Sequence, residues 1–246
     1  MKSKKNRKIK ILDRKINDPN KYSYTGTEDS KAIDIQIFKY NIAQYSEILN
    51  LNINEIEKFE ETDSVYWLNI YGLSNSDAIV KICKKINIDS IVIQDILDIS
   101  QRPKYQEFDN YFFFTIKSIV PDENDMLIEQ ISFIQGKNYL ISFQERKADF
   151  FEHIRYRIRE NVGNVRSNNS DYLLFTLLES ILDNYFKTLK IFEANLDINL
   201  TNSHNPKPEI IEQIEHDKKT IYKIKKTILP IKDFTFFIER GENKYV

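Results

Sequence analysis

Two aspartates stand close together in residues 91–104, which read IVIQDILDISQRPK. Asp95 and Asp98 are three residues apart, so on a helix their carboxylates project to the same side. Carboxylates near the end of a short helix usually face solvent, which is one interpretation. A second is a weak, largely hydrated Mg²⁺ site shared with another chain, because Mg²⁺ often keeps several waters and uses only one or two protein carboxylates.

Histidines and sequence motifs give no support to an enzyme. His153, His204 and His216 stand in unrelated polar contexts, and we interpret all three as solvated side chains. The sequence has no His-Glu-x-x-His, no Cys-x-x-Cys, no Walker loop and no Gly-x-Ser-x-Gly. Since the chain has only 5 glycines, a loop that cradles phosphate would be hard to build. We therefore expect a protein without catalytic residues.

Composition indicates a folded domain and argues against nucleic acid as the main ligand. The 246 residues, 41% of them apolar, suffice for one large α/β domain with or without a helical appendage. A net charge of −1 removes the broad electrostatic case for nucleic acid. The one cysteine, Cys83, fits a reducing compartment and reads as a buried structural side chain. No stretch approaches about 18 uncharged apolar residues, so we expect these residues to be soluble.

The elements that would position Asp95 follow from the spacing of apolar residues. Alternation of apolar and polar residues predicts strands, and apolar offsets of three and four predict helices. The predicted strands are residues 32–40, 65–71, 111–120, 126–135 and 138–143, and the predicted helices are 52–59, 76–86, 90–97 and 150–161. Ser76 and Asp89 are the expected N-caps of the two helices that they begin or precede. This order predicts a mixed sheet covered by helices.

The pattern changes after Gly163 to that of long helices. Apolar residues at every fourth position from Leu173 to Leu189 form a broad stripe on one helix. Two prolines within residues 203–208 end it, and isoleucines at seven-residue spacing predict a second helix. The two make a long antiparallel hairpin. We expect a basic, poorly ordered tail at 1–30, an α/β domain at 31–162 and the hairpin at 163–246.

Several segments resemble, in order, the motifs of the CorA family of magnesium transporters. QDILDISQRPK is similar to the family's Glu-Asp-Ile-Leu, which is followed a few residues later by Gln-Arg-Pro-Lys. The other similar segments are, in chain order, YWLNI at 66–70, YLISFQE at 139–145, RYRIR at 155–159, DYLLF at 171–175 and KTILPI at 226–231. The similarity extends over roughly residues 60–240, and its shared order makes it specific.

The resemblance implies an α/β/α sandwich with a mixed sheet, followed by the long antiparallel helical hairpin, in a pentameric funnel. It identifies Asp95 with the aspartate that binds regulatory Mg²⁺ between protomers, and Glu179 with an acidic residue of an adjacent secondary metal site. Gln94 stands where the family has a glutamate, and this weaker oxygen donor is expected to weaken the secondary site. The partner aspartate, two transmembrane segments and a Gly-Met-Asn loop are expected beyond Val246.

The resemblance therefore implies the cytoplasmic, metal-sensing domain of a divalent-cation (Mg²⁺/Co²⁺) channel, in which bound Mg²⁺ favours the closed state. Regulatory Mg²⁺ is the expected cofactor, with Co²⁺ or Zn²⁺ as alternatives. The expected partners are further copies of the chain and the inner membrane, through absent C-terminal helices, and not nucleic acid. Two alternatives stay open, a ZntB-like zinc transporter domain and a free-standing helical-hairpin interaction protein on the same fold. An unrecognised hydrolase would need a carboxylate cluster that the sequence does not show.

Overall fold

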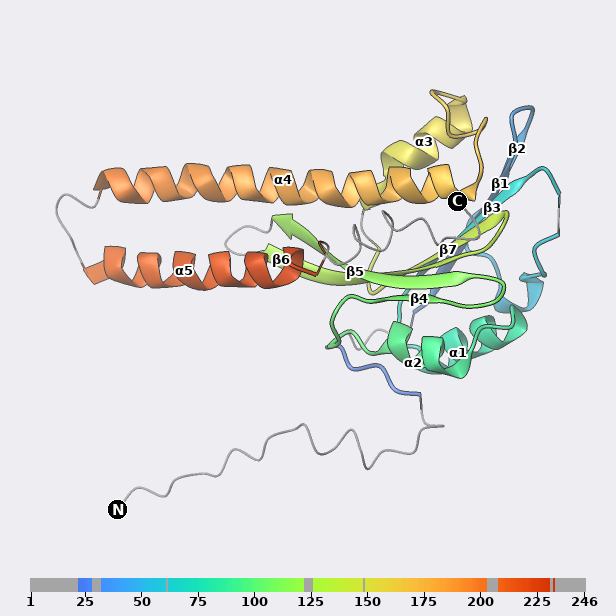
Figure 1. Ribbon diagram of the computed structural model, residues 1–246, viewed down its shortest axis with the longest axis horizontal. Helices are drawn as coiled ribbons and strands as arrows, with labels where there is room; N and C mark the ends of the chain where they lie inside the picture. Colours follow the sequence, from blue (N-terminus) through green and yellow to red (C-terminus); the bar gives the residue numbers. More distant parts are fainter. Residues whose placement is uncertain are drawn as a thin grey trace, which may run out of the picture.

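A seven-stranded mixed sheet forms the centre of the structure (Figure 1). The computed structural model describes residues 22–27, 32–60, 62–121, 126–147, 149–202, 208–230 and 232. In their order across the sheet, the strands are β2 (Tyr45–Ile48), β1 (Asp34–Tyr40), β3 (Val65–Tyr71), β7 (Tyr139–Gln144), β6 (Met126–Gln135), β5 (Phe112–Pro121) and β4 (Tyr105–Glu107). Neighbouring strands are antiparallel except for β3 and β7, which are parallel. The predicted mixed sheet is confirmed.

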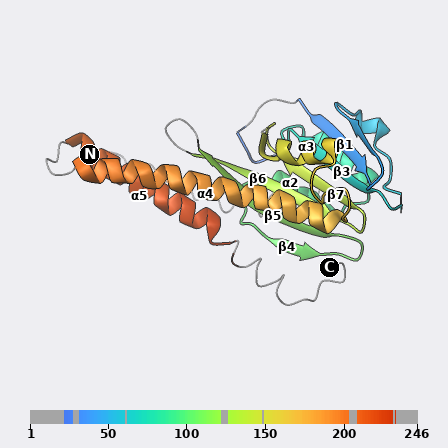
Figure 2. The ribbon, with the colours of Figure 1, turned by 90° about the horizontal axis from the view of Figure 1, so that it is seen from above.

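Helices cover both faces of the sheet. On one face lie α1 (Ser76–Lys85) and α2 (Ser90–Leu97), and on the other lie α3 (Glu152–Glu160) and α4 (Ser170–Asn202) (Figures 1 and 2). Beyond the sheet, α5 (Pro208–Ile228) lies beside α4. The α/β/α sandwich and its helical hairpin are thus confirmed. No helix in the described ranges is long and apolar enough to cross a membrane.

Two hydrophobic cores lie on the two sides of the sheet. The core under α3 and α4 is rich in aromatic rings, whereas the core under α1 and α2 is mainly aliphatic. Every residue of β3 is buried, because this central strand has partners on both edges and helices on both faces. Cys83 lies in the second core, where burial raises the pKa of its thiol. Its interpretation as a buried structural side chain is confirmed.

The Arg-rich helix α3 is held to the sheet by its own arginines. Arg159 forms a two-pronged ion pair with Glu47 of β2, at 2.7 Å from Nε and 2.6 Å from Nη2. Arg155 is buried and lies over the ring of Trp67, 5.6 Å from its centroid. Both arginines also bond to Glu152, at 2.7 and 2.9 Å. The charges of Arg155 and Arg159 are therefore engaged in contacts within the domain.

The segment before β1 lies partly against the folded domain. Residues 1–21 and 28–31 fall outside the described residues, and so does most of the predicted basic tail. In residues 22–27, the backbone N–H of Thr25 donates to the carbonyl of Leu97 at 3.1 Å. The hydroxyl of Tyr24 donates to Glu145 at 2.7 Å. This short segment therefore connects the end of α2 with the residue that follows β7.

The helix predicted at 52–59 is wrong in extent. Only one 3-10 turn forms, η2 (Ile53–Glu55), with a capping box between Asn52 and Glu55. The next residue, Ile56, has an extended backbone and is buried in the second core at 1% exposure. Burial of this side chain ends the turn, because a continuing helix would carry it in another direction.

The structure corrects the predicted N-cap of α1 and confirms the position of the predicted N-cap of α2. Asn75 caps α1, and its side-chain oxygen accepts from the N–H of Ala78 at 3.2 Å. The hydroxyl of Ser76 instead accepts from the N–H of Tyr24 at 3.2 Å. Asp89 stands at the N-cap of α2 but accepts its 2.6 Å hydrogen bond from the hydroxyl of Tyr111. Both predicted caps therefore bond to other segments of the chain.

Replacement of the cap residue should test this assignment. Asn75→Ala is expected to lower the free energy of unfolding by about 1 kcal/mol, because an N–H of α1 loses its acceptor. Asn75→Asp keeps an acceptor oxygen and should stay close to the wild type. Urea denaturation of the two variants measures the difference. Equal stability of Asn75→Ala and the wild type would contradict the role of Asn75 as a cap.

Candidate metal site at the end of α2

Asp95 lies in the last turn of α2 and forms an ion pair within its own chain. Its Oδ2 contacts Nζ of Lys104, which follows Pro103 in the extended segment that leads to β4. The two side chains are 13% and 28% exposed, so the pair is largely shielded from water. The carboxylate that the resemblance identifies as a metal ligand is thus already balanced by a cation.

The backbone at Asp95 is fixed by two amide side chains. Gln101 and Gln130 both donate to the carbonyl oxygen of Asp95, Gln130 at 3.2 Å. Gln130 belongs to β6 and is itself buried. The side-chain oxygen Oε1 of Gln130 accepts a hydrogen bond from Nζ of Lys117 at 3.1 Å. Burial lowers the pKa of Lys117 to about 8. The end of α2 is therefore tied to the middle of the sheet through a buried polar network.

Asp98 follows the last residue of α2 and is bonded within its own chain. It is buried, and its Oδ1 accepts from the hydroxyl of Thr25 at 3.1 Å and from the hydroxyl of Ser100 at 2.6 Å. The helical geometry from which a shared side was expected for the two aspartates does not extend to Asp98. The physical reason is that α2 ends at Leu97, and Asp98 has non-helical backbone angles of φ −91° and ψ 85°.

Glu179 lies on the opposite side of the sheet from Asp95. It is an exposed residue of α4, whereas Asp95 belongs to α2 on the other face (Figure 1). Its charge acts on His153, whose pKa is lowered by burial and by Arg157 while Glu179 partly opposes this shift. Gln94, the other position of the predicted secondary site, also belongs to α2, so a site with both Gln94 and Glu179 would need another copy of the chain. Glu179 stays a prediction.

The two histidines that the structure describes belong to α3 and α5 and not to the end of α2. His153 and His216 are exposed, as interpreted from the sequence, and His204 lies outside the described residues. Among the residues that the structure describes, no three His, Cys, Asp or Glu side chains are grouped to hold a metal ion. Asp95 can supply one carboxylate to Mg²⁺, which fits an ion that keeps most of its waters. The donor set in a single chain is therefore partial.

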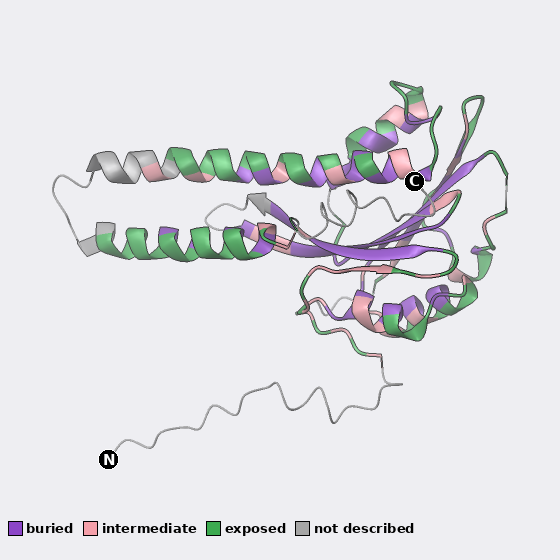
Figure 3. Cartoon of the chain, in the orientation of Figure 1, coloured by how far each residue is buried: buried purple, intermediate pink, exposed green. Residues whose placement is uncertain are grey.

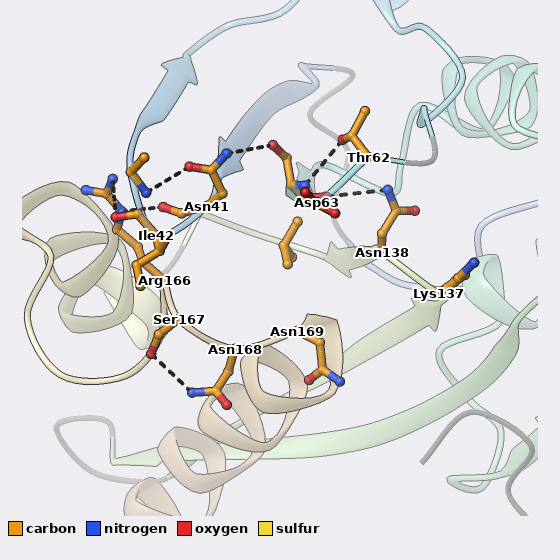
Figure 4. A pocket seen from close by; sticks show the side chains of 13 residues that line it. Asn41, Ile42, Thr62, Asp63, Lys137, Asn138, Arg166, Ser167, Asn168 and Asn169 are labelled. Carbon is orange, nitrogen blue, oxygen red and sulfur yellow. Dashed lines mark hydrogen bonds between the residues drawn. The ribbon is translucent and has the colours of Figure 1, made fainter.

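A polar hollow of about 530 Å³ lies elsewhere, where α4 begins (Figure 4). Its polar side chains mainly stabilise the loops around it. Asn41 donates to Ser64 at 3.4 Å, Asn138 to the carbonyl of Glu60 at 2.6 Å, and Arg166 to the carbonyl of Asn41 at 2.9 Å. Neither predicted metal residue, Asp95 or Glu179, lines it.

The fold is that of the soluble domains of known metal transporters. The soluble domain of CorA from Methanocaldococcus jannaschii matches with a TM-score of 0.67 and 18% identity, over 85% of this chain and 81% of that one. The ZntB cytoplasmic domain from Vibrio parahaemolyticus matches with a TM-score of 0.67 and 17% identity, over 86% and 82%. At these identities the likeness defines the architecture.

The sequence itself defines the family. Residues 62–245 match the family model described as CorA-like Mg²⁺ transporter protein. The chain therefore belongs to the CorA-like family. It is 30% identical over 218 residues to the cobalt/magnesium transport protein CorA of Thermotoga maritima, which covers 87% of this chain and 62% of that protein. It is 20% identical over 185 residues to the putative metal ion transporter YfjQ of Bacillus subtilis, over 74% and 57%. The chain thus spans about three fifths of these relatives.

Proposed function

We propose that this chain is the cytoplasmic regulatory domain of a divalent-cation transporter for Mg²⁺ and Co²⁺. Membership of the CorA-like family supports a transporter rather than an enzyme. The cobalt/magnesium transport protein is the more similar of the two curated relatives, at 30% identity against 20%. A Zn²⁺ transporter is the second candidate, because the ZntB cytoplasmic domain has the same fold. Flux measurements with Mg²⁺, Co²⁺ and Zn²⁺ distinguish the two.

The regulatory ligand in this proposal is Mg²⁺ bound at Asp95 between protomers. The single observation that carries it is the shielded carboxylate of Asp95 at the tip of α2, on a backbone fixed by Gln101 and Gln130. Two carboxylates about 4 Å apart repel by about 4 kcal/mol at an effective dielectric of 20. Bound Mg²⁺ offsets such repulsion and favours the closed arrangement of subunits. It does so only to the extent that it binds this arrangement more tightly than the open one.

Assembly into a homopentamer belongs to the same proposal. The long hairpin carries exposed apolar side chains, and Figure 3 shows exposed residues over much of α5. They include Phe175, Leu182, Phe186, Ile191, Ile211, Ile214, Ile221, Tyr222 and Leu229. Apolar surface that stays exposed on one chain is typical of a contact with another protein. Further copies of this chain are the partner that the proposal names.

Removal of the carboxylate tests the regulatory role. In the intact transporter, Asp95→Ala is expected to raise the Mg²⁺ concentration for half-inhibition of flux by about tenfold, which corresponds to about 1.4 kcal/mol of lost differential binding. Asp77→Ala, which removes an exposed carboxylate on α1, is the matched control and should leave inhibition unchanged. An unchanged Mg²⁺ titration for Asp95→Ala would defeat the assignment of this residue.

A further inference from the structure

The ion pair between Lys104 and Asp95 gives the carboxylate a cation that belongs to the protein. We propose that Lys104 occupies Asp95 when metal is absent, and that Mg²⁺ must displace its ammonium group in order to bind. This inference rests on the proposed function of Asp95 as a metal ligand. It adds a residue that sets the Mg²⁺ concentration at which the domain responds.

The backbone around Lys104 is anchored, so that only its side chain can move aside. The N–H of Lys104 donates to the hydroxyl of Thr115 at 3.2 Å, and its carbonyl accepts from the N–H of Thr115 at 2.9 Å. Asp95 is fixed as well, because its own carbonyl accepts from Gln101 and Gln130. Between these two anchored points, the ammonium group sits on a flexible four-carbon stem. Lys104 can therefore leave the carboxylate while the strands and α2 keep their places.

Competition follows from the geometry of one carboxylate oxygen. Nζ of Lys104 contacts Oδ2 of Asp95, where a directly bound Mg²⁺ would compete with it. Two cations at one carboxylate also repel each other, and the limited exposure of both side chains reduces screening by water. Mg²⁺ binding at Oδ2 therefore includes the loss of this ion pair. Without Lys104, Mg²⁺ should bind about five- to tenfold more tightly.

The pair also explains how the end of α2 is kept in place without metal. A carboxylate that is only 13% exposed is costly to leave unpaired, and Lys104 balances it. Exchange of Lys104 for Mg²⁺ then keeps the carboxylate balanced in both states. The released ammonium group becomes available to solvent or to a neighbouring chain.

Mg²⁺ titration of the intact transporter tests the proposal, with melting temperature and half-inhibition of flux as two readouts. Lys104→Met should give a larger Mg²⁺-dependent rise in melting temperature and half-inhibition at five- to tenfold lower Mg²⁺, on the order expected for one partly shielded ion pair. Lys104→Arg keeps the cation and should resemble the wild type. Lys147→Met removes a similar pair, with Asp34 at 2.7 Å, and should leave the Mg²⁺ response unchanged.

The outcomes separate this inference from the proposed function. If Asp95→Asn abolishes the Mg²⁺ response while Lys104→Met leaves affinity unchanged or lower, Lys104 does not compete and the inference is overturned. If Asp95→Asn responds to Mg²⁺ like the wild type, the regulatory site itself is misassigned and both fail. Should Lys104→Met be too unstable to titrate, Lys104→Gln provides a second neutral variant that must also bind Mg²⁺ more tightly.

Discussion

Replacement of Trp67 by alanine is expected to lower the free energy of unfolding by about 4 kcal/mol, at the upper end for core substitutions. Trp67 is fully buried at the centre of β3. Its ring stacks on Phe38 at 5.2 Å between centroids and meets Phe151 edge-on at 6.1 Å. Its indole N–H donates to the hydroxyl of Ser142 at 3.0 Å. Alanine would leave a large cavity among these rings.

A conservative variant separates the ring from its hydrogen bond. Trp67→Phe keeps most of the aromatic contact but removes the N–H donor, and should cost about 1–2 kcal/mol. Chemical denaturation in urea at neutral pH measures both variants. A loss below about 2 kcal/mol for Trp67→Ala would show that the core closes around the missing ring, contrary to this packing.

Glu129→Gln is expected to stabilise the protein at pH 7.5 by about 3 kcal/mol. Glu129 lies on β6 and is only 1% exposed. Burial raises the pKa of its carboxyl to about 7. Its Oε1 accepts from the N–H of Arg146 at 2.9 Å, whereas Oε2 has no hydrogen-bond partner among the described residues. Ionisation of this carboxyl in the folded protein is therefore unfavourable.

The sign of the pH dependence follows from the raised pKa. Between about pH 4.5 and 7, an unfolded chain has released the proton of Glu129 while the folded chain still holds it, so this group's contribution to stability falls as pH rises. Glu129→Gln removes this slope and should match the wild type near pH 4.5. Unfolding in urea at pH 4.5, 6 and 7.5 measures it. This range stays below the lowered pKa of Lys117, about 8, whose effect has the opposite sign.

A second glutamate provides the control. Glu145 accepts hydrogen bonds from the N–H of Gln130 at 3.0 Å and from the hydroxyl of Tyr24 at 2.7 Å. Glu145→Gln weakens these charge-assisted bonds and should destabilise the protein at pH 7.5. If both substitutions destabilise it equally, Glu129 is stabilised as a carboxylate and the expected slope is wrong.

Most of the fold could be predicted because its central elements have strong apolar patterns. The strands β3, β5 and β6 and the helices α1, α2 and α4 lie close to their predicted ranges. The strand β2 was not predicted, because three of its four residues are exposed at the sheet edge and show no alternation. Its key contact joins Glu47 and Arg159, which are 112 positions apart. β4 has only three residues, too few for a pattern.

The candidate site was predictable only in part. The resemblance identified the Asp95 segment. Helical spacing could not predict the position of the Asp98 side chain, because α2 ends one residue before Asp98. The ion pair with Lys104 was missed, since Pro103 breaks the helical geometry on which side-chain neighbours are predicted. The available signal for this ion pair was that Lys104 and Asp95 carry opposite charges within the same motif. Gln130 lies 35 residues from Asp95, and its contact depends on the order of strands in the sheet.

The parallel pairing of β3 and β7 has a consequence for biosynthesis. These strands pair in register from Tyr66 with Tyr139 to Tyr71 with Gln144, although about 70 residues separate them in the chain. At about 5–20 residues per second, a ribosome needs roughly 4–14 s to deliver β7 after β3. During that interval β1, β2 and β3 can form a hairpin sheet with one unpaired apolar edge. The nascent chain is therefore most exposed to aggregation, and most dependent on chaperones, before residue 144 emerges.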